Sequence, residues 1–296
     1  RIRKSYQQNK TKIISLNDLG DLTYPYESLD GNIENIKNII EDKHQISDLI
    51  KNAKKPLIII GQSTLRANSA KYVFESIKSF LLKNNKISNE WNSLNIISEN
   101  ASTVGSFDLG LYKTEDGSNK VLEDLENNKF EIVYLLGQDS LNFKKQNEFI
   151  IYQGSHGDKG AELADIILPG AAYTEQNGYF TNLEGKLQKA YKASYPPEDA
   201  KEDWQIINEL AEVMNHRKLF NDKDELDSSL LNQINLFLEK NTLEENLHID
   251  DLKFEKEILN ITSEDYYYSN AIARASKTMF ECKNSKTNLK FTGTEG

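Results

Sequence analysis

EIVYLLGQDSLNFKKQNEFIIYQGSHGDKGAELADIILPG, residues 131–170, contains three short apolar runs, and each of them ends at a glycine. The runs occupy 131–137, 149–154 and 165–170, and similar runs stand at 12–16 and 56–60. Continuous runs of Ile, Val and Leu are typical of strands buried on both faces, and the helical stretches between them favour parallel pairing. We therefore predict an α/β fold with a doubly wound, mostly parallel sheet.

Segments in which apolar residues recur at helical spacing alternate with these runs. They cover 32–53 and a long stretch around 72–81, and a third segment at 203–214 turns Trp204, Ile207, Leu210 and Ala211 inward. Beyond about residue 217 we expect polar helices, such as 226–238, with acidic loops and a loose tail from Lys283. We therefore predict an α/β domain over 1–216, incomplete at its N-terminal side, and a helical and loop C-terminal extension over 217–296.

The charge and the hydropathy of the chain argue against two classes of partner. The net charge is −10 and the sequence pI is about 5.1, whereas a protein that binds nucleic acid needs a basic surface. No apolar run approaches the roughly 20 residues that span a bilayer. We therefore expect no nucleic-acid partner and no direct membrane insertion.

Metal-binding side chains are few. Cys282 is the single cysteine, and one thiol can neither form an internal disulfide nor hold an iron–sulfur cluster, which takes about four ligands. The four histidines have no metal-ligand spacing; they are His44, His156, His216 and His248. We therefore expect no catalytic, cofactor-binding or metal-binding residue in this chain. Because the chain does not begin with Met, we also expect it to be processed, trimmed or taken from a longer product.

Two glycine-containing loops follow predicted strands. Gly61 precedes Gln62-Ser63-Thr64, where Ser63 or Thr64 would cap a helix; the segment lacks the lysine of a phosphate-binding loop. The second loop has glycines at three-residue spacing, at Gly154, Gly157 and Gly160. It leads quickly into another strand rather than a long helix, which argues against a phosphate site. A ligand role nevertheless stays open there, because ligands of parallel sheets bind beyond the carboxyl ends of the strands.

Side chains of the types used in catalysis also occur. Ser155, His156 and Asp158 are the residue types of a catalytic triad, but neighbouring side chains diverge and a triad is assembled from distant segments. Four carboxylates lie near aromatic residues without a spacing that predicts a shared site; they are Glu175, Asp199, Glu202 and Asp203. Residues 198–203 instead resemble the acidic start of the following helix.

The stretch 152–204 contains a distinctive succession of residues: Ala164, Asp165, Leu168, Pro169, Glu175, Gly178, Asn182, Glu184, Gly185 and Gln188. They fit the pattern A-D-x-x-L-P, followed by an acidic residue, a glycine and an N-x-E-G/R-x-x-Q element. In this pattern the stretch resembles the molybdopterin-oxidoreductase superfamily. Flanking motifs narrow the resemblance to the large iron–sulfur subunit of respiratory complex I, mitochondrial type. They are YQGSHGD at 152–158, PGAAYTE at 169–175 and PPEDAKEDW at 196–204, with ordered matches at 1–5, 21–24, 53–56, 108–110 and 273–276.

This resemblance implies a structural and interaction role in the hydrophilic arm of complex I, which carries electrons from NADH to ubiquinone. The family's cluster-binding cysteines belong to an N-terminal part, so iron–sulfur clusters and FMN are expected in partner chains. One such partner would carry the iron–sulfur half and complete the sheet. The expected location is the matrix side of the mitochondrial inner membrane. Asn182 and Glu184 would hold turns by hydrogen bonds.

Two other functions remain as alternatives. A working molybdenum oxidoreductase, such as a formate dehydrogenase, needs a β-rich C-terminal pterin domain and usually a Cys, selenocysteine or Ser ligand to the metal. After Trp204 the chain instead has the pattern of helices and polar loops. A stand-alone nucleotide-binding domain is the third possibility, and it predicts micromolar affinity of the isolated chain for a nucleotide.

Overall fold

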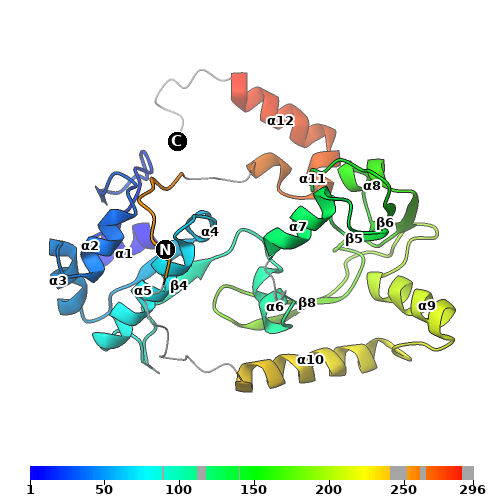
Figure 1. Ribbon diagram of the computed structural model, residues 1–296, viewed down its shortest axis with the longest axis horizontal. Helices are drawn as coiled ribbons and strands as arrows, with labels where there is room; N and C mark the ends of the chain where they lie inside the picture. The colour runs from blue at the N-terminus through cyan, green and yellow to red at the C-terminus, as the bar shows by residue number, and fades with distance from the viewer. Residues whose placement is uncertain (89, 112–117, 140, 241–251, 261–264, 289–296) are drawn as a thin grey trace. The chain divides into compact units, whose positions relative to one another are not determined.

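The computed structural model describes residues 1–88, 90–111, 118–139, 141–240, 252–260 and 265–288 (Figure 1). The chain forms two compact units. Unit 1 comprises residues 1–99 and 243–263, and unit 2 comprises residues 100–242 and 264–296. The domain boundary expected near residue 216 stays a prediction.

Unit 1 alternates helices with short strands. Its elements are α1 (Ile2–Asn9), β1 (Ile14–Ser15), β2 (Glu27–Ser28), α2 (Glu34–Ile40), α3 (Gln45–Asn52), β3 (Ile58–Gly61), α4 (Gln62–Leu65), α5 (Ala70–Lys83) and β4 (Leu94–Ile97). β1 pairs with β2 and β3 pairs with β4, and both pairs are parallel. The apolar stretch 32–53 forms two helices, α2 and α3, instead of one.

The core of unit 1 is aliphatic and aromatic. Helix α5 supplies most of it, because its apolar residues recur one turn apart on a single face. The buried residues are Ile33, Ile60, Tyr72, Val73, Ile77, Phe80, Leu81 and Leu259. The segment 252–260 joins this core from far along the chain. The Leu259 N–H donates to the Gly31 carbonyl at 2.9 Å.

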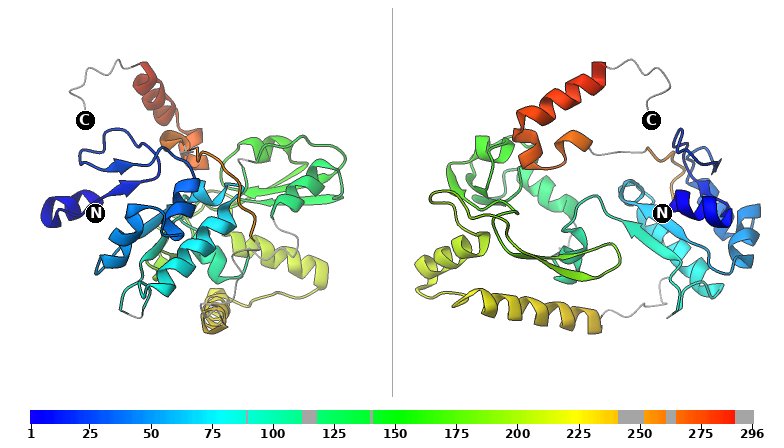
Figure 2. Two further views of the ribbon diagram at one scale, coloured as in Figure 1. Left: turned by 60° about the vertical axis from the view of Figure 1, so that its left-hand side comes forward. Right: turned by 180° about the vertical axis from the view of Figure 1, so that it is seen from behind.

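Unit 2 contains the three apolar runs of the stretch 131–170 as strands, and two further strands follow that stretch. Its elements are α6 (Thr103–Asp108), α7 (Ser118–Glu126), β5 (Ile132–Leu136), β6 (Phe149–Gly154), α8 (Lys159–Leu163), β7 (Ile166–Pro169), β8 (Gly178–Thr181), β9 (Leu187–Ala190), α9 (Asp203–Asn215), α10 (Lys223–Lys240), η2 (Tyr266–Tyr268), α11 (Ala271–Ala275) and α12 (Lys277–Asn288). The strands β5, β6 and β7 lie side by side in that order and are parallel (green in Figure 2), whereas β8 and β9 form an antiparallel pair.

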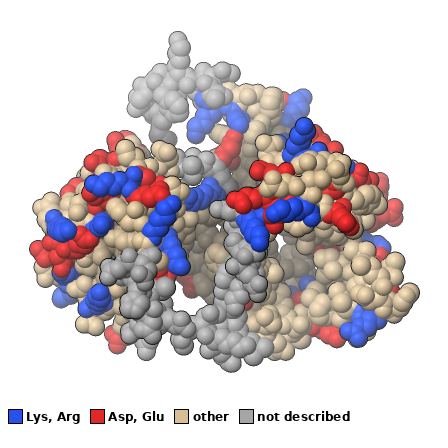
Figure 3. Space-filling model, in the orientation of Figure 1, with Lys and Arg blue, Asp and Glu red and all other residues tan. Residues whose placement is uncertain are grey.

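The predicted α/β class and the parallel pairing are confirmed. The strands are close to the apolar runs of the sequence. Leu135 on β5 and Ile150 and Tyr152 on β6 form a buried cluster, and residues of α8 pack against it. Within the described residues the strands form four sheets of two or three strands rather than one continuous sheet. On the face drawn in Figure 3, Lys and Arg side chains are interspersed with Asp and Glu.

Three local predictions are wrong. The apolar strands of unit 2 are not buried on both faces, since Ile132, Ile166 and Ile167 are 64%, 46% and 54% exposed. On α9, Leu210 is exposed and Asn208 points inward instead, because the Asn208 side chain bonds the backbone at Leu219 and Phe220. The expected loose tail is helical as far as Asn288, since Lys283 lies within α12. Residues 289–296 are outside the described part of the chain.

Candidate functional site

A polar cluster, centred on a buried glutamine and otherwise half-buried, joins the motif segments of unit 2. It consists of Tyr134 on β5, Gln153 on β6, Gln176 in the loop after β7 and Asp203 at the start of α9. The Gln153 amide is fully buried; its Nε2 donates to Asp203 Oδ1 at 2.8 Å and its Oε1 accepts the Tyr134 hydroxyl. Gln176 Nε2 donates to Asp203 Oδ2 at 2.8 Å. These contacts bring together the motif segments YQG (152–154), YTEQ (173–176) and EDW (202–204).

The cluster destabilises the fold unless every hydrogen bond is made, because a buried polar group without a partner costs about 1–3 kcal/mol. The Asp203 N–H also donates to Gln176 Oε1 at 3.2 Å, so the two side chains bind each other twice. Burial, together with the negative charge of Asp203, raises the pKa of the Tyr134 hydroxyl, which therefore stays protonated and donates. The cluster therefore stabilises the packing of these segments and does not have the arrangement of an acid–base pair.

The other predicted carboxylates are used locally. Glu202 forms a capping box with Gln205 at the start of α9 and accepts from Trp204 Nε1 at 3.0 Å. Glu175 Oε2 accepts the Ala172 N–H at 2.9 Å, and Asp199 is exposed. The structure therefore does not gather the four carboxylates into one site.

The motif segment A-D-x-x-L-P fastens the sheet. Asp165 Oδ2 accepts the Ile150 N–H of β6 at 2.8 Å, and its Oδ1 accepts from Lys145 at 2.6 Å. The backbone N–H of Ile150 and then the ammonium of Lys145 lower the pKa of the Asp165 carboxyl. At the other end of β7, a Cβ on Gly170 would lie 2.8 Å from Asp203 Oδ1, so a larger residue there would crowd the polar cluster.

The turn between β8 and β9 is held by Asn182. Its Oδ1 accepts the N–H groups of Glu184 and Lys186, each at 2.9 Å, and Gly185 has a φ of +77° that favours glycine. The role expected for Asn182 is confirmed. Glu184 contributes its backbone N–H, while its side chain is exposed.

The loop with three-residue glycine spacing is built around Tyr152. The Tyr152 hydroxyl donates to the His156 carbonyl at 2.8 Å. A Cβ on Gly154 would overlap with that hydroxyl, and a Cβ on Gly160 would lie 2.7 Å from the Gln138 carbonyl oxygen. Two of the three glycines therefore allow close packing, and the ring of Tyr152 fills the space inside the loop.

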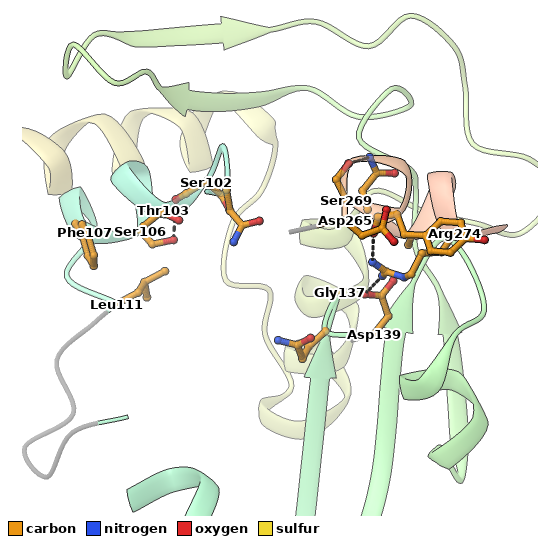
Figure 4. A pocket seen from close by; sticks show the side chains of 15 residues that line it. Ser102, Thr103, Ser106, Phe107, Leu111, Gly137, Asp139, Asp265, Ser269 and Arg274 are labelled. Carbon is orange, nitrogen blue, oxygen red and sulfur yellow. Dashed lines mark hydrogen bonds and ion pairs between the residues drawn. The ribbon is translucent and has the colours of Figure 1, made fainter. Parts of the chain in front are cut away.

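Arg274 of α11 binds the loops at the carboxyl ends of β5 and β6, and Figure 4 shows its contact with Asp139 after β5. Its Nη2 lies 2.6 Å from Asp139 Oδ1 and its Nε lies 2.5 Å from Asp158 Oδ2. Its Nη1 donates to the Tyr268 carbonyl at 3.1 Å. We call this end of the sheet the carboxyl edge. It adjoins a cleft of about 780 Å³. The cleft is lined by Asn100, Ser102, Thr103, Ser106, Phe107, Leu111, Gly137, Gln138, Asp139, Asp265, Tyr268, Ser269, Asn270, Ala271 and Arg274.

The triad residue types do not form a triad. Ser155 Oγ lies 3.0 Å from His156 Nδ1, so the expected divergence is wrong for this pair, although the expectation that the three residues form no triad holds. Asp158 instead binds Arg274 and caps α8 by accepting the Lys159 N–H at 2.9 Å. Without an acid to orient the histidine, the pair lacks the arrangement that activates a serine.

A family model described as molybdopterin oxidoreductase matches residues 1–213. The chain belongs to the molybdopterin oxidoreductase family. Curated relatives show which members of this family the chain is similar to. The chain is 36% identical over 291 residues to the NADH-ubiquinone oxidoreductase 75 kDa subunit of Reclinomonas americana, a match that covers 95% of this chain and 42% of that protein.

Two further relatives have related names. An NADH-quinone oxidoreductase subunit of Rickettsia bellii is 34% identical in an alignment of 297 residues that covers 99% of this chain and 42% of that protein. The mitochondrial NADH-ubiquinone oxidoreductase 78 kDa subunit of Candida albicans is 30% identical in an alignment of 298 residues that covers 95% of this chain and 40% of that protein. The chain thus spans about two fifths of the length of the curated relatives it matches. These names do not favour a formate dehydrogenase.

The family name implies a molybdenum–pterin cofactor, and the residues at the carboxyl edge of the sheet do not fit one. A pterin cofactor carries anionic phosphate, whereas the edge presents the carboxylates of Asp139 and Asp158. The guanidinium that neutralises them is already used for that purpose. The Gly154–Gly160 loop, which could otherwise approach a phosphate, is filled by Tyr152.

The remaining candidate positions are ordinary surface or loop features. At α4 the N-cap is Gly61 and the structure shows no side-chain cap, so the predicted capping by Ser63 or Thr64 is wrong. Cys282 is exposed on α12, and His248 lies outside the described residues. In the described part of the chain we find no group of three or more His, Cys, Asp or Glu placed to hold a metal, and no helix with the length and apolar content to span a membrane.

Sequence reasoning missed Tyr134, Gln153, Gln176 and Arg274. Gln153 and Gln176 stand inside the motif segments YQG and YTEQ, so their position in the resemblance was the available signal. Arg274 lies in the short ordered match at 273–276. Neither charge nor spacing distinguishes these residues from other polar side chains.

Proposed function

We propose that this chain is the molybdopterin-oxidoreductase-like part of the large iron–sulfur subunit of respiratory complex I, with a structural and interaction role in the hydrophilic arm. The observation that carries the proposal is the match to complex I subunits over 95–99% of the chain. In this role the chain supports electron transfer from NADH to ubiquinone without a redox group of its own.

The use of the motif residues supports a structural role. Gln153, Gln176 and Asp203 bind one another, Asp165 ties β6 to β7, and Tyr152 fills the glycine loop. Side chains that are all engaged inside the unit are available neither to hold a cofactor nor to transfer protons. The chemistry of the site is therefore that of a rigid scaffold.

The proposal extends to partners and location. The iron–sulfur clusters and FMN would belong to neighbouring chains, one of which carries the N-terminal iron–sulfur half of the subunit. The chain would lie on the matrix side of the mitochondrial inner membrane, as a peripheral component of the arm. The mitochondrial relative supports this location.

Isolation of the complex tests the proposal. Inner membranes are solubilised in mild detergent, resolved on a native gel and stained for NADH dehydrogenase activity, and the active band is analysed for peptides and for metals. We expect peptides of this chain in the active band, with molybdenum and tungsten far below one atom per chain. Absence of the chain from that band, or stoichiometric molybdenum or tungsten, would overturn the proposal and return the formate-dehydrogenase-like alternative.

A pair of variants separates a scaffold from a catalyst. Gln153→Leu removes the centre of the polar cluster, whereas Gln188→Leu changes an exposed glutamine on β9. We expect Gln153→Leu to lower the amount of assembled complex while the NADH oxidation rate per assembled complex stays unchanged. Gln188→Leu should change neither quantity. A lower rate per complex in Gln153→Leu would contradict a purely structural role.

A further inference from the structure

The C-terminal segment 265–288, which we call the strap, is a small assembly of its own. Its helices η2, α11 and α12 pack on one another. Asp265 pairs with Lys283, whose ammonium lies 4.2 Å from the centre of the Tyr268 ring. No residue from 265 to 286 is buried. The strap therefore gains little stability from apolar burial against the rest of unit 2.

Arg274 holds the strap on the rest of unit 2 by charged contacts instead of apolar burial. Its guanidinium bridges the carboxylates of Asp139 and Asp158, which we call the notch. Asp139 follows β5 and Asp158 follows β6, so one side chain of the strap spans the ends of two adjacent strands. Asp139 is well shielded at 10% exposed, whereas Arg274 and Asp158 are half-buried at 24% and 27%. Charge-assisted hydrogen bonds of this kind are about twice as strong as neutral ones.

The notch matches a guanidinium better than an ammonium. Two carboxylates accept from two different nitrogens, Nη2 and Nε, which a planar fork offers at fixed spacing. A lysine ammonium is a single compact point of charge at the end of a flexible stem and cannot reproduce this bridge. With no cation present, the shielded carboxylate of Asp139 would lack its counter-charge.

We propose that the notch is a guanidinium-binding site at the carboxyl edge of the sheet, that Arg274 occupies it in cis, and that this contact makes the strap a latch. While Arg274 is bound, the strap closes one side of the cleft at this edge. When Arg274 leaves, the strap opens as a unit and the sheet stays folded. An arginine side chain of a neighbouring chain would compete for the same two carboxylates. The proposal does not depend on membership of complex I.

Hydrogen exchange of the full chain measures the latch. Arg274→Gln should speed exchange of the amides in 265–288 by roughly 10- to 100-fold, the range given by hydrogen bonds to charged groups. The amides of β6 should keep their wild-type rates. In Arg274→Lys, exchange of the strap amides should be faster than in wild type and slower than in Arg274→Gln. Lys201→Gln, which breaks an exposed ion pair with Glu209, is the matched control and should leave the strap unchanged.

Chemical rescue tests the ligand class. In Arg274→Ala, millimolar methylguanidinium should slow exchange of the strap again, while tetramethylammonium at the same concentration should not. Strap exchange unchanged in Arg274→Gln would overturn the latch. So would an equal rise in β6, because the strap and the sheet would then unfold together. Equal effects of the two cations would overturn the guanidinium site.

Discussion

Unit 1 and unit 2 are held together by different kinds of contact. The core of unit 1 is formed by eight buried apolar residues centred on α5. The buried apolar cluster around the β5–β6–β7 sheet of unit 2 has three, and beside it lie buried polar residues with specific partners. Buried Gln153 donates to half-buried Asp203, and buried Glu202 accepts from the indole N–H of Trp204.

This difference explains where the family resemblance is concentrated. An apolar core accepts many side chains of similar volume, whereas a buried hydrogen-bond network accepts few substitutions because each leaves a partner unsatisfied. The residues of unit 2 are therefore identifiable as motifs, while those of unit 1 show mainly an apolar pattern. Four substitutions test the distinction.

The largest effect is expected from Leu81→Ala in unit 1. Leu81 is fully buried, and the loss of such a side chain costs about 2–5 kcal/mol, through lost burial and a residual cavity. Hydrogen exchange should show faster opening of α5 and β3, while amides of β6 in unit 2 keep their rates. An equal loss of protection in both units would mean that they unfold as one, and the comparison would fail.

Gln153→Leu should have the next largest effect, in unit 2. The leucine fills much of the space but leaves Asp203 Oδ1 and the Tyr134 hydroxyl without this partner, at a cost of about 1–3 kcal/mol. Urea unfolding, followed through the exchange of β6 amides, measures the loss. Gln188→Leu should stay within about 0.5 kcal/mol of wild type. A stabilised Gln153→Leu would show that apolar packing matters more than the cluster.

Gly160→Ala probes the packing around Tyr152. The added Cβ would lie 2.9 Å from the Tyr152 ring and 2.7 Å from the Gln138 carbonyl oxygen, and overpacking of this kind costs about 1–2 kcal/mol. Gly157→Ala is the matched control, because a Cβ there meets nothing within 4 Å. Thermal unfolding of the two variants should separate them. Equal melting temperatures would mean that the loop yields without strain.

The smallest effect is expected from Asp227→Asn, which weakens the link between α10 and β9. Burial acts to raise the pKa of the Asp227 carboxyl, but Lys189 and Lys223 outweigh it, and the pKa lies below its usual value. Because the folded pKa is lowered, the stabilisation is present above the unfolded value of about 4 and is lost as the pH falls through the folded pKa. Asparagine keeps the shape of the buried side chain, and the two lysines are 27–30% exposed and screened by solvent, so we expect a difference of about 1 kcal/mol or less at pH 7 that disappears in acid. A difference independent of pH would exclude the ion pairs as its source.

The strands could be predicted from the sequence, but their partners could not. The runs at 131–137 and 149–154 became β5 and β6, because Ile, Val, Tyr and Phe favour extended backbone, although Ile132 and Leu136 stay 64% and 50% exposed. The inward position of Asn208 was missed, since it depends on carbonyl and N–H groups that the following loop brings back to α9.

The polar contacts of the site were beyond sequence reasoning for a similar reason. Gln153 and Asp203 are 50 positions apart, and Asp139 and Arg274 are 135 apart. A hydrogen bond between two such side chains depends on the placement of both backbones, and residue spacing along the chain carries no information on that. The resemblance marked several of these positions as distinctive without indicating what they bind.

The segment 252–260 has a consequence for synthesis of the protein. Asn17 donates to the Leu259 carbonyl at 2.7 Å across 242 positions, and Ser69 binds the backbone of Glu255 across 186. Unit 1 is therefore completed by a segment that leaves the ribosome long after the rest of it. All of unit 2 up to α10 emerges in between. Domains generally fold as units during synthesis, so the core of unit 1 stays incomplete until this segment is made. We expect a chaperone that binds exposed apolar segments to bind unit 1 during that interval.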